Sequence, residues 1–463
     1  MSLKSPLGAT QGGSFELARD GLALPAARSR SRSGLIALGV LLGAGAALSI
    51  CASETDLLLP ESVRPVPSWL AGVFGHTGVA LGTIPLVGLL ALTFGAYATA
   101  VARAEQLSAR TVLASIAALH ALVLLAPPLL STDVFSYQAY ARMFADYGSS
   151  PYLHGPQAIQ LDPVYSFIGA KWVTTPTAYG PLFTGLSALL APLSIAASVV
   201  AYKAIAVVAS LVVVALVWNT ARLRGLNQVK AAALVGLNPL VVIYGVGGGH
   251  NDLLMLAVML GAVALLLQHR DRAAGVSLMI ATAIKLTAGL LAPFALAGLG
   301  RSGGRSRRRD FVLGAGVVAL VTAVATLAVF GSGSLHLLHT LRHNQALGDW
   351  HSIPGFISTR LGFGTIGHVT GVVLGCVFVI VLGWLVRRVW RGELDWIDGA
   401  AWATAAMLAT ASSMLPWYIA WLMPLAALAH DPRIARVAMR MTGLVVAITA
   451  IGYIPHGQSV LGL

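Results

Sequence analysis

The sequence predicts an all-α integral membrane protein, a polytopic bundle of about 11 to 13 transmembrane helices with interfacial helices on its external side. Of its 463 residues, 57% are hydrophobic and only 10% are charged. In soluble domains, about 45–50% of the residues are hydrophobic and about 25% are charged. Apolar runs of about 20 residues, long enough to cross a hydrocarbon core, recur from residue 34 almost to the C-terminus. This composition excludes a water-soluble enzyme.

The N-terminal segment, residues 1–33, is expected to form a disordered cytoplasmic tail. Its Gly, Ser and Ala residues and its arginines alternating with serines include too few large apolar side chains to build a core. The run 34–51 is long and is followed by many further spans, so we interpret it as a transmembrane helix rather than a signal peptide. We divide the remainder into a transmembrane hairpin (34–110), a transmembrane core (111–455) and a short external tail (456–463).

Apolar runs and helix breakers together predict the spans. They are 34–51, 79–102, 111–130, 196–218, 231–247, 253–268, 311–331, 365–386, 397–414, 416–429 and 438–453. Basic clusters bracket residues 273–299 on both sides, so we expect two half-helices that fold back to the cytoplasm instead of one crossing. Residues 181–193, which follow the Tyr179-Gly180-Pro181 turn, are expected to form an outer-face half-helix.

The distribution of positive charge sets the orientation. With the N-terminus and alternate loops inside, 23 of the 30 Lys and Arg residues lie on the cytoplasmic side and five outside, and Lys203 and Lys285 fall within apolar runs. This is the bias that the positive-inside rule requires. We therefore expect a multi-pass plasma-membrane protein whose polar external segments, 131–180, 247–252 and 332–364, hold the active site.

Several kinds of site are not expected. The cytoplasmic loops are short and arginine-rich, and no phosphate-binding GxxxxGK[ST] or GxGxxG pattern occurs where it would be needed. The net charge of +13 invites a nucleic-acid interpretation, but the positions of the cations explain it better in a membrane chain. Cys51 and Cys376 lie far apart in apolar runs, so we expect no disulfide and no metal–thiolate site. No strong metal-ligand spacing is present.

The first external segment offers a candidate general base, Asp133. Pro127 and Pro128 should end the preceding helix, and Ser131 or Thr132 can then cap a new one. Asp133 is either part of that cap or a general base at the mouth of a lipid-lined cavity, and the residues alone leave both open. The aromatic residues that recur at helical spacing on the new helix, and that we expect at the headgroup level, are Tyr137, Tyr140, Phe144 and Tyr147.

A second carboxylate lies in the external turn 247–252, whose sequence is Gly-Gly-Gly-His-Asn-Asp. Three glycines let the backbone approach a ligand closely or adopt positive φ. His250 and Asp252 are thereby placed together at the membrane surface. The alternative is that Asn251 or Asp252 only caps the next helix.

Cations suited to bind a lipid phosphate follow in the third external segment, where Arg342 and His343 are adjacent. Lys203 and Lys285 fall inside apolar stretches, which makes each a candidate for function. Lys203 lies near enough to the outer end to snorkel, whereas Lys285 lies at the expected tip of the 273–299 hairpin. The aromatic residues after Pro416, namely Trp417, Tyr418 and Trp421, are expected to form an interfacial belt.

These motifs together resemble a known family. The order Asp133…Tyr137, Ser150-Pro151-Tyr152, Tyr179-Gly180-Pro181, Asn238-Pro239-Leu240, Gly249-His250-Asn251-Asp252 and Pro416-Trp417-Tyr418 is similar to that of the actinobacterial polyprenol-phosphomannose-dependent alpha-1,6-mannosyltransferases. Those enzymes belong to the multispanning glycosyltransferase C superfamily. The resemblance covers roughly residues 34–455 and implies that the core 111–455 is catalytic. Unlike the longer family members, this chain is expected to have a short C-terminus, Ile454–Leu463, without an appended soluble domain, which leaves acceptor and linkage open.

The resemblance implies single-displacement, inverting transfer of mannose from polyprenyl-phosphate-mannose to a lipid-anchored mannan or related cell-envelope glycan on the outer face, as in lipomannan biosynthesis. Asp133 would be the catalytic base. The implied roles are substrate binding for Tyr137, Tyr152, Tyr179, His250, Asn251 and Asp252, and donor-phosphate binding for Arg342, His343 and Lys203. We expect no cofactor, although Asp133 and Asp252 leave a divalent metal open. The partners would be the lipid-linked donor, the glycan acceptor and membrane lipids, without nucleic acid.

Two alternatives remain at this stage. Arabinofuranose carriers present the same phosphate and polyprenyl tail, so another sugar is possible. A lipid or sugar transporter without transferase activity would also have broken helices and buried lysines. Such transporters have internal repeats related by symmetry, and no convincing repeat relates the two halves of this sequence.

Overall fold

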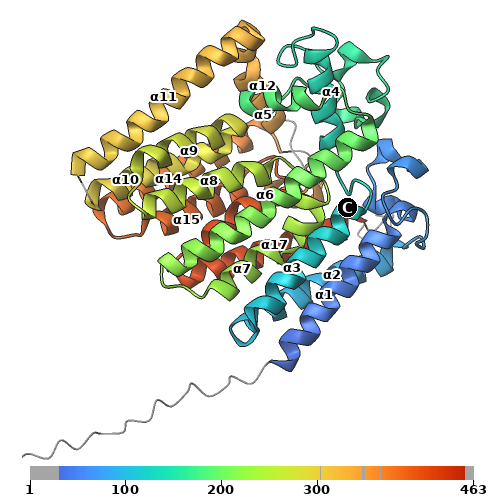
Figure 1. Ribbon diagram of the computed structural model, residues 1–463, viewed down its shortest axis with the longest axis horizontal. Helices are drawn as coiled ribbons and strands as arrows, with labels where there is room; N and C mark the ends of the chain where they lie inside the picture. Colours follow the sequence, from blue (N-terminus) through green and yellow to red (C-terminus); the bar gives the residue numbers. More distant parts are fainter. Residues whose placement is uncertain (1–30, 303, 347–349, 365, 454–463) are drawn as a thin grey trace, which may run out of the picture.

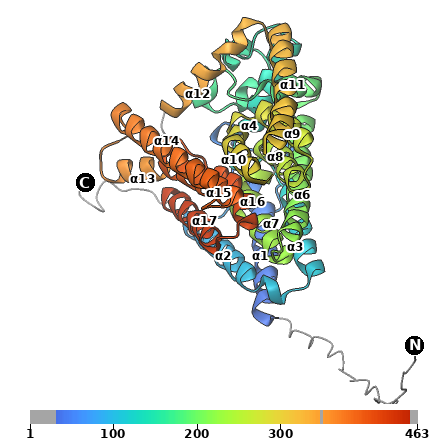
Figure 2. The same ribbon diagram turned by 90° about the vertical axis from the view of Figure 1, so that its left-hand side faces the viewer.

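The computed structural model of the chain describes residues 31–302, 304–346, 350–364 and 366–453. Every regular element in these ranges is helical, and they contain no strand, so the predicted all-α membrane fold is confirmed. The predicted N-terminal tail and the short external tail fall outside the described residues, apart from residues 31–33 at the start of the first helix. Figures 1 and 2 show the long helices running side by side through one bundle.

Within the described ranges, six helices are long and apolar enough to cross a membrane, or up to seven if one bent pair counts as a span. The six are α1 (Arg32–Cys51), α2 (Thr83–Ala102), α6 (Ile195–Leu223), α11 (Gly304–Phe330), α14 (His368–Arg391) and α17 (Pro432–Tyr453). The bent pair joins α7 (Gln228–Gly236) to the π-helical segment η10 (Leu240–Val246) at an angle of 47°.

This number is smaller than the 11 to 13 that the sequence predicts, because breaks divide the other apolar runs into helices of 17 residues or fewer. The shorter helices include α3 (Ala109–Leu125), α8 (Asp252–Leu267), α9 (Asp271–Ile284), α10 (Ala292–Ser302), α15 (Trp396–Thr410) and α16 (Ile419–Leu428). Proline causes some of these breaks, since it cannot donate a backbone hydrogen bond. The span expected at 111–130, for example, ends as a helix at Leu125, two residues before Pro127.

The hairpin expected at 273–299 is present. Helix α9 ends at Ile284, Lys285 is extended, and the 3-10 segment η11 (Leu286–Leu291) leads into α10. Arg307, at the start of α11, contacts Asp271 at the start of α9 with an Nε–Oδ2 distance of 2.7 Å. The chain thus returns to the end of the bundle from which α9 began, and Lys285 lies at the turn.

The two ends of the bundle differ in chemistry. One end, here called the site end, contains the α3–α4 connection (126–132) and the turn 247–251. The other, called the basic end, contains the arginine clusters, including Arg308 stacked on Trp390 at 4.0 Å and Arg224 paired with Asp395 at 2.9 Å. The predicted half-helix after Pro181 is also present, as α5 (Pro181–Ser187) and η9 (Ala188–Leu190) leading into α6.

The aromatic face predicted on α4 (Asp133–Ala145) is only partly correct. Tyr147 is half exposed, but Tyr137 and Tyr140 are buried. Helices α5 and α6 and the segment that follows α4 pack around α4. These two tyrosines therefore line the protein interior rather than the headgroup layer.

Candidate active site

Asp133 and His250 meet at the site end although 117 positions separate them in sequence. His250 Nδ1 lies 3.1 Å from Asp133 Oδ2. Asp133 begins α4, and its backbone N–H donates to Ser131 Oγ at 3.1 Å, but the N-cap residue Thr132 makes no side-chain capping bond, so the predicted side-chain cap is not formed. The Asp133 carboxylate does not cap the helix and pairs with His250 instead.

The glycine turn makes this pairing possible. Gly249 has φ +66°, and a Cβ placed there would lie 2.6 Å from Val134 Cγ1. The N–H of Leu129 donates to the carbonyl of Gly247 at 3.1 Å, which joins the turn to the α3–α4 connection. Only glycine satisfies both the backbone conformation and the close approach to α4.

His250 is held from behind by Trp417. The two rings stack with centroids 3.7 Å apart and an interplanar angle of 18°. The His250 side chain is 0% exposed, whereas that of Asp133 is 17% exposed. In this structure, therefore, Asp133 is the member of the pair that can meet a substrate, and His250 contacts it from the protein side rather than lining the cleft as a substrate ligand.

Asp252 forms a separate cluster with Lys285, the residue at the tip of the hairpin. Lys285 Nζ lies 2.7 Å from Asp252 Oδ1, and Trp421 Nε1 donates to the same oxygen at 2.6 Å. The Lys285 ammonium also lies over the rings of Tyr418 and Trp421, at 5.2 and 5.4 Å. Asp252 thus joins α8 to both the hairpin and α16.

The predicted interfacial belt at Trp417, Tyr418 and Trp421 is wrong for this reason. Trp417 and Trp421 are buried, and all three aromatic rings pack against His250 or Lys285 rather than lipid. Their spacing after Pro416 resembles a belt because belt residues and buried aromatic residues at a helix end have the same local sequence pattern.

The tyrosines named as substrate contacts form the wall beside Asp133. The Tyr137 hydroxyl lies 3.4 Å from Asp133 Oδ2 and accepts a hydrogen bond from the N–H of Asn251 at 3.3 Å. The Tyr179 ring packs edge-on against Tyr137, with centroids 4.8 Å apart. Tyr152 donates to the Tyr179 carbonyl at 3.1 Å, and is fully buried. The tyrosines and Asn251 therefore support the position of Asp133, and their contact with substrate stays a prediction.

The surroundings of Asp133 favour its ionised form. Burial alone would raise the pKa of its carboxyl, but the charge and hydrogen bond of His250, the charge of Lys285 and a hydrogen bond from Tyr179 together hold the pKa below its ordinary value. The same negative charge, together with burial, raises the pKa of Tyr179 well above its ordinary value. Asp133 is therefore an anion at neutral pH, as a proton acceptor must be.

A cleft of about 350 Å³ opens beside Asp133. Its volume falls in the range of small-molecule sites, about 300–1,000 Å³. Cations, aromatic rings and aliphatic side chains share the lining, which includes Leu57, Arg64, Asp133, Lys171, Trp172, Tyr244, Trp350, His351, Trp417 and Tyr453. Such a lining suits a ligand with a charged group, a polar ring and an apolar chain.

The cations that line this cleft are Arg64, Lys171 and His351 rather than the predicted Arg342, His343 and Lys203. Arg342 and His343 lie on α12 (Leu337–Ala346), which contributes no residue to the lining. Arg64 and Lys171 are distant from Asp133 in sequence, so only the tertiary fold shows that they lie near it.

Lys203 is fully buried, and its Nζ donates to the carbonyl oxygens of Ala126 and Pro127. These two carbonyls directly follow the last residue of α3, where no backbone N–H of the helix is available to bond them. Lys203 thus stabilises the α3–α4 corner that carries Asp133. Lys203 does not line the Asp133 cleft, and its predicted contact with a donor phosphate stays a prediction.

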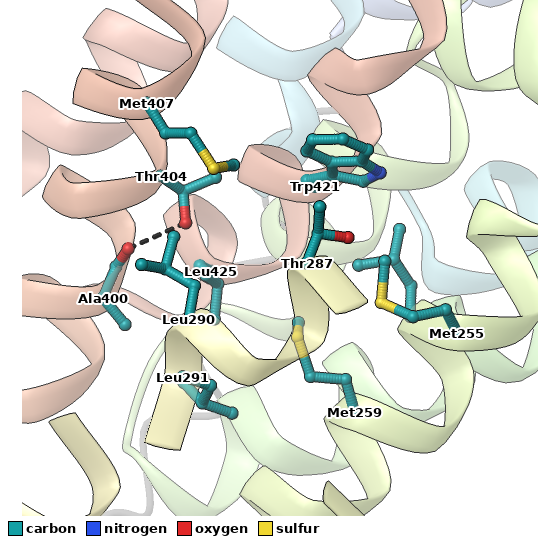
Figure 3. A pocket seen from close by; sticks show the side chains of 11 residues that line it. Met255, Met259, Thr287, Leu290, Leu291, Ala400, Thr404, Met407, Trp421 and Leu425 are labelled. Carbon is teal, nitrogen blue, oxygen red and sulfur yellow. Dashed lines mark hydrogen bonds between the residues drawn. The ribbon is translucent and has the colours of Figure 1, made fainter. Parts of the chain in front are cut away.

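A smaller cavity, shown in Figure 3, lies where α8, η11, α15 and α16 meet. Its volume is about 20 Å³, and Met255, Met259, Thr287, Met407 and Trp421 are among the residues that line it. This is room for about one water molecule. It cannot hold a sugar. The Asp133 cleft is the candidate substrate site because a carboxylate and basic side chains line it.

No group of three or more His, Cys, Asp or Glu residues in the described ranges is arranged to hold a metal ion. Asp133 and Asp252, the two carboxylates named as a possible metal pair, contact different partners. His250 lies against Asp133, and Lys285 lies against Asp252. Metal dependence stays an untested part of the prediction.

The fold defines the class, a polytopic, all-α membrane protein, and the Asp133 cleft at one end of its helix bundle is the candidate reaction centre. Comparison with known families specifies it further. Residues 33–300 match the alpha-(1->6)-mannopyranosyltransferase N-terminal domain, and residues 345–462 match the MptB C-terminal domain. The chain belongs to this alpha-(1->6)-mannopyranosyltransferase family and is a glycosyltransferase, which confirms the resemblance seen in its motifs.

Individual relatives agree with this family membership. The chain is 31% identical over 432 residues to alpha-(1->6)-mannopyranosyltransferase A of Mycobacterium tuberculosis, covering 88% of this chain and 81% of that protein. It is 28% identical over 335 residues to alpha-(1->6)-mannopyranosyltransferase A of Corynebacterium glutamicum, covering 65% and 68%. No solved structure matches the chain.

Proposed function

We propose that this protein transfers a mannosyl residue from polyprenyl-phosphate-mannose to a lipid-anchored mannan or related glycan on the outer face of the plasma membrane. Mannosyl transfer is the activity named for its relatives. The observation that supports this donor is the composition of the cleft, where an ionised carboxylate, cations and apolar walls lie together. A lipid-phosphate sugar presents the matching groups.

In the proposed reaction, Asp133 accepts the proton of the acceptor hydroxyl as that oxygen bonds to the anomeric carbon. The bond between that carbon and the phosphate oxygen breaks, and the phosphate leaves with the electron pair. One displacement converts a beta-linked donor into an alpha-linked product. Phosphate is already a good leaving group, so the residues need only stabilise its charge, which we assign to Arg64 and Lys171 in the cleft.

The proposed orientation puts the N-terminus in the cytoplasm and the site end outside. Its support is the charge distribution, because the arginine clusters of the basic end match the positive-inside rule. A cysteine introduced at exposed Ser166, near the cleft, should react with an impermeant maleimide in intact cells, and one at exposed Asn219 should not. The opposite labelling would reverse the orientation.

The test of function uses purified protein in nanodiscs with polyprenyl-phosphate-mannose and a short mannoside acceptor, followed by mass spectrometry. We expect the wild type to extend the acceptor by one hexose and Asp133→Asn to form no measurable product. Asp146→Asn is the matched control, since Asp146 is exposed at the other end of α4. Product from polyprenyl-phosphate-arabinofuranose but not from the mannose donor would change the sugar, and a wild type inert with every such donor would refute the proposal.

A further inference from the structure

The C-terminal part of the chain contains a second cavity, about twice as large as the Asp133 cleft. It is a groove of about 750 Å³ formed by α14, α15 and α17. Helices α14 and α17 both pack against α15, as Figure 2 shows for this side of the molecule. Its walls are mainly apolar and include Trp384, Trp402 and Met441, so the groove is suited to a hydrocarbon chain rather than a sugar.

One end of the groove lies close to the Asp133 cleft. Ile353 lines the groove, and His351, two residues earlier, lines the cleft. Two residues of chain span about 7 Å at most. Helix α17 contributes to both cavities as well, with Met441 in the groove and Tyr453 in the cleft. The cleft and the groove are therefore neighbouring compartments on either side of the 350–353 segment.

The other end of the groove lies at the basic end of the bundle and is polar. Arg388, Asp431 and Arg433 line it there. Arg388 is already engaged, because it pairs with Glu393 at 3.3 Å and stacks on Trp384 at 5.1 Å. Asp431 adds a negative charge. The cleft also combines basic residues with carboxylates, since Arg64 and Lys171 lie there with Glu61 and Asp133, and we place the lipid phosphate in the cleft because the proposed base, Asp133, borders it.

We propose that this groove binds the isoprenoid chain of the lipid-phosphate donor while its sugar phosphate occupies the Asp133 cleft. The inference rests on the proposed function. The chain leaves the cleft beside Ile353 and follows Trp402 and Met441 toward the basic end. The region matching the C-terminal family domain then forms the groove, and the region matching the N-terminal domain supplies Asp133 and His250.

The experiment blocks the groove at Ala409, an exposed residue in its lining near the site end. Ala409→Trp is compared with Ala323→Trp, which places the same side chain on an exposed face of α11 outside the groove. Each protein is assayed with a full-length polyprenyl-phosphate-mannose and with a short-chain donor of two isoprene units. The measured quantities are kcat and KM for the donor.

We expect Ala409→Trp to raise KM for the full-length donor about tenfold, the loss expected when roughly two methylene groups of the chain cannot be buried. Its kcat and its KM for the short donor should stay unchanged, and Ala323→Trp should resemble the wild type with both donors. Equal effects on both donors, or none on either, would overturn the groove assignment while leaving the transfer reaction intact. A wild type inactive with both would instead refute the proposed function and this inference with it.

A second measurement does not depend on turnover. A polyprenyl phosphate with a diazirine in its chain is irradiated with the wild-type protein, and the adducts are mapped by mass spectrometry. Adducts on α15 and α17 that Ala409→Trp removes would support the groove. Adducts only on lipid-facing residues of α11, or a phospholipid retained in the groove that the polyprenyl phosphate does not displace, would contradict it.

Discussion

The two carboxylates of the site end, Asp133 and Asp252, are similar in sequence context but differ in what surrounds them. Each begins a helix, and each pairs with a basic side chain. The Asp133 side chain is 17% exposed and borders a cleft, whereas that of Asp252 is 2% exposed. Both a lysine and an indole donate to one oxygen of Asp252. Asp133 is therefore available for reaction, and Asp252 holds three segments together.

The same contrast applies to the basic partners. His250 is enclosed between Asp133 and the Trp417 ring and belongs to a short turn. Lys285 reaches Asp252 from the tip of a hairpin that enters from the basic end. Because His250 comes from a turn beside Asp133, it can influence that carboxylate with little effect on the stability of the fold. A partner supplied by a distant hairpin makes the ion pair part of the tertiary fold.

The largest expected effect is a difference in kcat between variants of the two carboxylates. Asp133→Asn should lower kcat by about 10²–10⁴-fold, because it removes the general base, and should leave the melting temperature almost unchanged. Asp252→Asn should retain kcat within about tenfold but lower the melting temperature, because Lys285 then lacks its anion. Donor turnover and thermal unfolding in nanodiscs measure both. If Asp252→Asn abolished turnover at full stability, the assigned difference between the two would be incorrect.

Removing Lys285, the basic partner of Asp252, should have the next largest effect. Lys285→Met leaves the buried Asp252 carboxylate unpaired, which should destabilise the fold by about 3–5 kcal/mol. The double variant Lys285→Met/Asp252→Asn should recover most of this loss, since an amide carries no charge. A thermal melt monitored by tryptophan fluorescence tests it. Failure of the second substitution to restore any stability would show that Lys285 acts through other contacts.

The turn that carries His250 provides a test of intermediate size. Gly249→Ala should cost about 1–3 kcal/mol from the clash with Val134, in addition to backbone strain at positive φ. Turnover should fall as His250 moves away from Asp133. Gly225→Ala is the matched control, because Gly225 has φ +69° but no neighbouring atom within 4 Å of an added Cβ. Equal losses in the two variants would indicate that only strain matters.

The smallest expected effect concerns pH. Transfer requires ionised Asp133, so the rate should fall as the pH drops through its pKa, which His250 helps to keep below the ordinary value. His250→Ala removes that support, so the pKa should rise and the acid limb of kcat/KM should move to higher pH. His250→Asn can still donate a hydrogen bond and should give a smaller shift. An unmoved acid limb in His250→Ala would exclude this positioning role.

The sequence by itself determined the membrane class, the hairpin and the segment that holds the proposed catalytic carboxylate. Hydropathy reveals apolar spans because each span must match the thickness of a bilayer. Basic residues before and after residues 273–299 predict that the chain turns back, and proline pairs mark where α3 must end. These signals are local in sequence, so they can be recognised without knowing which helices pack together.

Only the tertiary structure decided which side chains meet. Nothing in the sequence pairs Lys285 with Asp252, or places Trp417 behind His250, because such contacts depend on helix packing across long separations in the chain. The cations of the cleft were misassigned for the same reason. Arg342 and His343 share an external segment with His351, but the fold brings Arg64 and Lys171 to the cleft instead. Charge and hydropathy indicate on which side of the membrane a residue lies, whereas helix packing determines which side chains it contacts.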